Sequence, residues 1–310
     1  MKRYSAWLVV FGSALWGTDA LFRRPLTTTL SPVTIVLLEH CVLALVMFPV
    51  VLKYRREFLG LHGRDYAALL VIALGGSVAA TSLFTFAIKY DNPSVVILLQ
   101  KTQPLFTVFL ARLFLGERPA RWFWACFACA TAGAYLMSAP DWQNGLPSNP
   151  GHPAIVLSAI GAAALWGSAT VCGRYVAPKI STPFLTALRF LCALPALAIL
   201  YSLQPALQRQ LPTDFSSVAR VAGMALISGL AALLIYYRGL RSTPASIASI
   251  CELSFPVTAV AVNWLILDAR LSGVQIVGSG VLIASVTVLA YAHGREQNTT
   301  TTAGPKLIRS

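Results

Sequence analysis

Ten long apolar segments divide this chain, and they constrain its fold more than any other feature. Each is about 17 to 24 residues long, which allows a helix to cross a hydrocarbon layer about 30 Å thick. In lipid every backbone N–H and C=O group needs an internal partner, so such segments form helices. We therefore predict an all-α membrane protein with ten transmembrane helices, at residues 5–22, 32–52, 66–88, 93–115, 120–138, 153–173, 183–203, 217–237, 244–267 and 271–292.

The composition agrees with this class and excludes others. Only 11% of the residues are charged, whereas about 25% are charged in typical soluble domains. The net charge of +13 does not indicate nucleic-acid binding, because Lys and Arg occur in short clusters between apolar segments. The six cysteines, including the CxxC pair Cys126 and Cys129, lie inside apolar segments. We therefore expect free thiols, with no metal and no cofactor.

Positive charges are distributed unevenly between alternate loops. One set of loops and termini carries fifteen Lys and Arg residues, and the other carries six, including Arg23. Because cytoplasmic loops are richer in Lys and Arg, this bias predicts a multi-pass protein of the inner (plasma) membrane with both termini in the cytoplasm. The stretch 293–310 is polar and low in complexity, so we predict a disordered cytoplasmic tail.

The sequence contains an internal duplication. A Leu-Trp-Gly motif at residues 15–17 recurs at 165–167, an offset of 150. Pro104 matches Pro256 at an offset of 152, and the residues around both prolines align as well. The chain therefore consists of two copies of one unit.

Each copy contains five predicted spans, and this odd number means that the second copy enters the membrane from the opposite side. We expect a first repeat at residues 1–139, an outer (periplasmic) connecting loop at 140–152 and a second, inverted repeat at 153–292. Inverted repeats commonly build secondary transporters, which bind substrate near the middle of the membrane and alternate access by rocking one half against the other.

The paired Leu-Trp-Gly motifs, together with NPSVVILLQKTQPLFTVFLARLFLGERP in the fourth span and TPASIASICELSFPVTAVAVNWLILDAR in the ninth, resemble the EamA-type drug/metabolite transporter (DMT) superfamily. The resemblance covers residues 5–292. It implies a ten-helix permease built from inverted repeats, often an exporter of amino acids or other small metabolites. Two departures stand out: Glu39 replaces an arginine that the family commonly has in the second span, whereas Arg189 retains its counterpart, and Asp268-Ala269 replaces a Gly-Glu pair.

Four charged residues inside the spans are the main candidate site residues. Glu39 lies roughly 10 Å below the outer face and Lys101 roughly 12 Å below it, at a rise of about 1.5 Å per residue. Arg189 lies about 9 Å and Glu252 about 12 Å from the cytoplasmic face. Pairing reduces the free energy of burying a charge, so we predict two ion pairs, Glu39 with Lys101 and Arg189 with Glu252.

These pairs have two interpretations. They can hold the helices in register without touching substrate, or they can face the central path, bind the ends of a zwitterion and take up a coupling proton on Glu39 or Glu252.

Three uncharged residues complete the candidate set. Trp16 and Trp166 lie near the middle of matched spans and can form flat walls of a cavity or pack against the adjacent glycines. Gln103, next to Pro104, can present its amide inward, or the proline can be a tolerated kink. Tyr236 and Tyr237 lie at a predicted span end, which favours interfacial anchors over ligands.

The leading functional hypothesis is a permease that moves a small polar or amphipathic metabolite, such as an amino acid, outward across the inner membrane. Its partners are then the substrate and the bilayer, with a coupling proton as an open alternative. No phosphate-binding GxxxxGK[ST] loop is present, so ATP use by this chain is not expected. The sequence contains no HExxH or GxSxG motif and no cluster of residues at metal-ligand spacing, so no motif indicates an enzyme. A membrane scaffold or sensor that transports nothing is the alternative.

Overall fold

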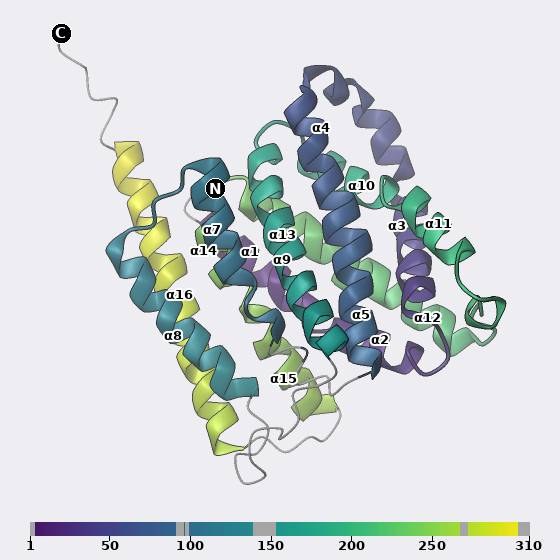
Figure 1. Ribbon diagram of the computed structural model, residues 1–310. Helices are drawn as coiled ribbons and strands as arrows, with labels where there is room; N and C mark the ends of the chain where they lie inside the picture. Colours follow the sequence, from purple (N-terminus) through teal and green to yellow (C-terminus); the bar gives the residue numbers. More distant parts are fainter. Residues whose placement is uncertain (1–3, 91–95, 97–98, 139–152, 267–271, 303–310) are drawn as a thin grey trace.

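A computed structural model describes residues 4–90, 96, 99–138, 153–266 and 272–302 of the chain (Figure 1). These residues form helices joined by short turns, and no strand occurs among them. The helical elements are α1 (Ser5–Trp16), α2 (Asp19–Leu26), α3 (Pro32–Tyr54), η2 (Arg55–Gly60), α4 (Gly63–Leu70), η3 (Val71–Ala79), α5 (Ala80–Tyr90), α7 (Gln103–Leu115), α8 (Arg121–Ser138), α9 (Pro153–Val176), α10 (Thr182–Leu191), α11 (Leu194–Ser202), η5 (Ala206–Gln208), α12 (Phe215–Gly223), η6 (Met224–Ala231), α13 (Ala232–Leu240), α14 (Ala245–Cys251), α15 (Ser254–Ile266) and α16 (Gly273–Thr302).

Eight helical segments of the described chain are long and apolar enough to cross a membrane. They correspond to eight of the ten predicted spans. The predicted fourth span contains the shorter apolar helix α7, and the predicted fifth span is α8. The helical class is therefore as predicted, while the count of ten spans stays a prediction.

A disordered tail was predicted at residues 293–310; residues 293–302 are helical instead, and residues 303–310 lie outside the described part of the chain. Helix α16 continues through Thr302, and its polar end is held by contacts with neighbouring segments. Gln297 Nε2 donates to the Ser242 carbonyl at 2.7 Å, and Trp122 Nε1 on α8 donates to Glu296 at 3.1 Å. The expected connecting loop at 140–152 and the Asp268-Ala269 pair lie outside the described residues.

Several helices are interrupted where the two sequence copies match. The third predicted span of each copy contains a π-helical segment, η3 in the first copy and η6 in the second. The fourth and ninth predicted spans turn at Lys101-Thr102 and at Glu252-Leu253, an offset of 151. Such interruptions free backbone groups and place polar side chains at membrane depth, which is tolerated where they line a cavity.

The end of α7 connects the two copies. Gly116 adopts a left-handed conformation (φ 66°) after the last turn of α7, which a residue with a Cβ atom adopts at a penalty. Glu117 follows, and its carboxylate accepts from the backbone N–H groups of Ala245 and Ser246 at 2.7 and 2.9 Å. It thereby caps the first turn of α14, at the positive end of that helix.

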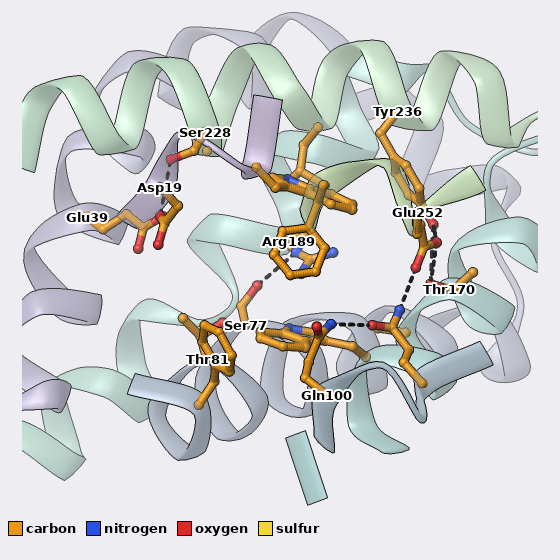
Figure 2. A pocket seen from close by; sticks show the side chains of 18 of the residues that line it. Asp19, Glu39, Ser77, Thr81, Gln100, Thr170, Arg189, Ser228, Tyr236 and Glu252 are labelled. Atoms are coloured by element: carbon orange, nitrogen blue, oxygen red, sulfur yellow. Dashed lines mark hydrogen bonds between the residues drawn. The ribbon is translucent and has the colours of Figure 1, made fainter. Parts of the chain in front are cut away.

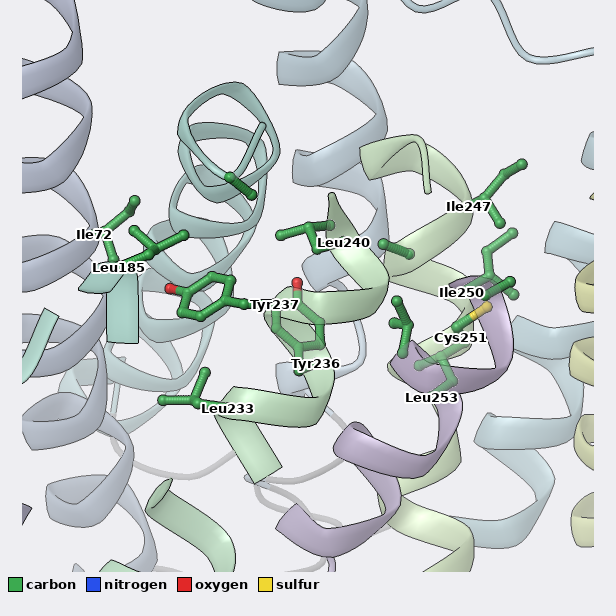
Figure 3. Close-up of a cluster of buried hydrophobic side chains, with 14 of the residues drawn as sticks. Ile72, Leu185, Leu233, Tyr236, Tyr237, Leu240, Ile247, Ile250, Cys251 and Leu253 are labelled. Carbon is green, nitrogen blue, oxygen red and sulfur yellow. The ribbon is translucent and has the colours of Figure 1, made fainter. Parts of the chain in front are cut away.

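One buried core joins helices from both halves of the sequence. Figure 3 shows Ile72 of η3 and Leu185 of α10 near Tyr237 of α13, with Ile250 of α14 in the same cluster. Tyr237 is fully buried, and Tyr236 is 2% exposed. The prediction that these tyrosines are interfacial anchors is therefore wrong, because α13 continues to Leu240 and both rings point into the protein.

Helices α8 and α16 pack along each other at one edge of the molecule (Figure 1). Two glycines, Gly133 on α8 and Gly278 on α16, permit this close approach. A Cβ atom added to Gly278 would lie 2.5 Å from the Met137 nitrogen and 2.8 Å from the Gly133 carbonyl oxygen. A Cβ on Gly280, two residues further along α16, would meet nothing within 4 Å.

This contrast gives a matched pair of variants. Gly278→Ala is expected to lower the melting temperature in detergent, because overpacking of this kind destabilises by about 1–3 kcal/mol. Gly280→Ala should keep or raise that temperature, since alanine favours helix over glycine by about 1 kcal/mol. Equal melting temperatures for the two variants would contradict the packing of α8 on α16.

Candidate functional site

A central cavity lies between helices of the two sequence halves (Figure 2). Its volume is about 170 Å³. Aromatic and apolar residues form part of its wall, and polar residues, five of them charged, form the rest. Figure 2 shows Asp19 and Glu39 on one side of the cavity, Glu252 on the opposite side and Arg189 between them.

Arg23 forms salt bridges with the carboxylates of Asp19 and Glu39 on one side of the cavity. Its Nε donates to Asp19 Oδ2 at 2.5 Å, and its Nη2 donates to Glu39 Oε2 at 2.9 Å. The turn between α1 and α2 explains this geometry, because it starts a new helix in which residues 19 and 23 lie one turn apart on the same face. Arg23 is 5% exposed and Glu39 is 7% exposed, so mutual pairing is what makes their burial tolerable.

The predicted pair of Glu39 with Lys101 is therefore wrong. Lys101 is also buried, but its Nζ donates to the Ala134 carbonyl on α8 at 2.6 Å, and it does not line the central cavity. The position of a residue along a helix fixes its depth in the membrane, but it does not fix the direction in which the side chain points around the helix axis. Lys101 faces α8, whereas Glu39 faces Arg23 on α2. From the sequence, Arg23 had been assigned to an outer loop.

Arg189 lies in the cavity, as its position in the sequence had suggested, but without its predicted partner. Its Nε donates to Ser77 Oγ at 2.9 Å and its Nη1 to Tyr237 Oη at 3.0 Å. Its Nη2 donates no hydrogen bond to any residue that the structure describes. No hydrogen bond or salt bridge joins Arg189 to Glu252 in this part of the chain, although both line the same cavity. Arg189 thus offers a cationic donor to a molecule in the cavity.

Glu252 is surrounded by neutral hydrogen-bond donors. Tyr236 Oη and Thr170 Oγ1 donate to its Oε1 at 2.6 and 3.1 Å, and Gln103 Nε2 donates to its Oε2 at 2.5 Å. These donors come from α13, α9 and α7. Glu252 therefore connects helices of both sequence halves at the wall of the cavity.

The two tryptophans line the cavity as well. The Trp16 ring lies 5.0 Å from that of Tyr236, measured between centroids. Trp166 Nε1 donates to the Gly76 carbonyl at 2.9 Å, an oxygen that the π-helical segment η3 makes accessible. Because its polar edge is satisfied there, Trp166 contributes an apolar surface to the wall.

The structure thus gathers six of the seven candidate residues around one cavity and excludes Lys101. Sequence reasoning missed several polar lining residues, among them Asp19, Ser77, Gln100 and Ser228. Ser77 lies in the π-helical segment η3 of the first copy and Ser228 in η6 of the second. Ser77 accepts from Arg189, and Ser228 donates to Asp19 at 3.2 Å. No motif in the sequence singled them out.

Comparisons with known proteins agree with this architecture. A sequence model of the EamA-like transporter family matches residues 3–139 and again residues 153–291. The riboflavin transporter ImpX of Fusobacterium nucleatum subsp. nucleatum is 28% identical over 290 residues, which are 91% of this chain and 95% of that protein. A solved structure described only as a crystal structure of a protein has a TM-score of 0.75, 17% identity and coverage of 95% of this chain and 100% of its own. At that identity it supports the fold alone.

Proposed function

Because the chain belongs to the EamA-like transporter family, we propose that it is a secondary transporter that carries a small amphipathic metabolite through its central cavity. The observation that carries this proposal is the cavity itself. It brings aromatic walls, a cationic donor on Arg189 and a buried carboxylate on Glu252 together between the two halves of the sequence. Aromatic walls combined with polar groups that fix the orientation of a ligand are typical of small-molecule sites.

The transport mechanism that we propose is alternating access by two inverted five-span repeats. Two separate matches to one family model, and interruptions at matched positions of the two copies, support this arrangement. A cavity walled by residues of both copies would open to either side when one repeat rocks against the other. An inner-membrane location, cytoplasmic termini and outward transport stay predictions from the charge bias and the family resemblance.

For the substrate we propose a flavin, meaning a flat heteroaromatic ring with a polar side chain. The similarity to a riboflavin transporter supports this choice, and so does the cavity. Trp16 and Trp166 offer aromatic surfaces on which a flat ring can stack, and Arg189 offers donors for ring carbonyl groups. An amino acid, which the sequence alone had suggested, is the competing substrate class.

Ligand-dependent thermal stability tests this substrate class. Riboflavin at a hundred times its Kd should stabilise the purified protein by about 2.7 kcal/mol, whereas phenylalanine, the amino-acid control, should not. Arg189→Met should weaken the stabilisation, while Gly280→Ala should leave it intact. If phenylalanine stabilises and riboflavin does not, the substrate proposal is wrong. If no metabolite in a broad panel binds, a scaffold or sensor role becomes the better account.

A further inference from the structure

Two glutamine amides extend the contacts of Glu252 into the cavity. Gln103 Nε2 donates to Glu252 Oε2 at 2.5 Å, and Gln100 Nε2 donates to Gln103 Oε1 at 2.9 Å. Gln100, which lies just before α7, also lines the cavity. We refer to Gln100, Gln103 and Glu252 as the amide relay.

The relay has a direction because an ionised carboxylate only accepts hydrogen bonds. Gln103 must therefore turn its NH₂ group toward Glu252 and its oxygen toward Gln100. Gln100 must therefore donate from its NH₂ group to Gln103 Oε1. Its Oε1 is left without a donor from any described residue, although the side chain is only 7% exposed. A buried acceptor without a donor is unfavourable, so this oxygen is suited to a donor on a molecule in the cavity.

We propose that the amide relay makes Gln100 a specificity-determining residue whose hydrogen-bonding role depends on whether Glu252 carries a proton. This inference rests on the proposed transport function and deepens it. With Glu252 ionised, Gln100 presents Oε1 and selects a ligand that donates, through an N–H or O–H group. With Glu252 protonated, Gln100 presents its NH₂ group and selects a ligand that accepts.

The reversal follows from counting donors and acceptors. When Glu252 takes a proton from water on Oε2, that oxygen becomes a donor, and Gln103 must turn its amide by about 180° to present Oε1 to it. Gln103 Nε2 then points at Gln100, which turns in the same way to accept with Oε1. The Gln100 NH₂ group moves to the place that Oε1 had occupied. No other bond changes.

The other groups around Glu252 are compatible with a proton on Oε2. Tyr236 from α13 and Thr170 from α9 both donate to Oε1 and can continue to do so when that oxygen is the carbonyl of an acid. Oε2 accepts from Gln103 alone among the described residues. Arg189 on α10 and Tyr237 on α13 line the same cavity without bonding Glu252, and Cys251 precedes it on α14.

For a flavin, the relevant donor is the imide N–H of the ring. The proposal predicts that an ionised Glu252 favours this N–H and that protonation of Glu252 disfavours it. Substrate release would then accompany proton uptake at a site that the substrate does not itself touch.

A matched ligand pair tests the proposal. Riboflavin and 3-methylriboflavin differ in the imide N–H alone, and their Kd values would be measured on the purified full-length protein across a pH series. At the alkaline end we expect wild type to bind riboflavin about tenfold more tightly, because the methylated ring leaves Gln100 Oε1 unpaired. At the acid end this preference should fall to about twofold or less.

Two variants isolate the relay. Gln100→Leu should remove the preference at every pH, and Glu252→Gln, which cannot ionise, should make the preference independent of pH. Equal affinity of wild type for the two flavins, or a preference that Gln100→Leu leaves intact, would overturn the proposal.

A measurement without ligand separates this inference from the substrate proposal. In protein labelled with ¹⁵N-glutamine, the side-chain amide resonances of Gln100, assigned with the Gln100→Leu variant, should shift with pH in wild type and not in Glu252→Gln. A pH-independent Gln100 amide would overturn the relay whatever the substrate is. If riboflavin does not bind while the amide shifts as expected, the flavin proposal fails and the relay stands.

Discussion

The Glu252→Gln variant is expected to lose riboflavin accumulation driven by a pH gradient by at least about a hundredfold. A glutamine can keep hydrogen bonds to Tyr236, Thr170 and Gln103, so the fold and binding should survive, but it cannot take up and release a proton. The measurement is uptake into proteoliposomes with an imposed pH gradient.

Two comparisons make this result specific. Exchange of labelled for unlabelled riboflavin, which needs no net proton movement, should persist in Glu252→Gln. Glu296→Gln changes a carboxylate on α16 outside the central cavity and should accumulate riboflavin as wild type does. Normal accumulation by Glu252→Gln would remove Glu252 from the coupling mechanism.

Replacing Arg23 by methionine is expected to destabilise the protein by about 3–5 kcal/mol. The substitution removes the cation that Asp19, 22% exposed, shares with the buried Glu39, and the two carboxylates then repel each other. The measurement is the melting temperature of the variant in detergent, with correctly folded yield as a second readout.

Lys101→Met is the matched control for this prediction. It also removes a buried cation, but one whose Nζ donates to the uncharged Ala134 carbonyl, so the loss of this hydrogen bond leaves no carboxylate unpaired. Its melting temperature should fall much less. The sequence-based pair of Glu39 with Lys101 predicts the reverse order, so the two variants decide directly between the pairings.

The membrane-spanning architecture could be read from the sequence because lipid requires long apolar helices. The same requirement does not specify how each helix is rotated about its axis. Lys101 and Glu39 were placed at similar depths, yet they face α8 and α2 and do not pair. Arg23 was assigned to a loop because the turn at Gly17-Thr18, which starts a second helix, has no hydropathy signal.

The duplication predicted more of the site than any single motif did. It paired Trp16 with Trp166, and both line the cavity. The duplication could not reveal the hydrogen-bond donors to Glu252. Tyr236 and Thr170 reach it from helices whose packing the sequence does not give. The C-terminal helix was missed for a related reason, since contacts such as the one from Gln297 to Ser242 hold its polar end.

We propose that a flavin crosses the membrane through the cavity between the two sequence halves. Counterflow of labelled riboflavin in proteoliposomes, comparing wild type with Thr81→Trp, tests it most directly, because Thr81 lines the cavity and an indole there would fill it. Wild type and Gly280→Ala are expected to show counterflow, and a correctly folded Thr81→Trp variant is expected to show none. Undiminished counterflow by Thr81→Trp, or none by wild type, would contradict it.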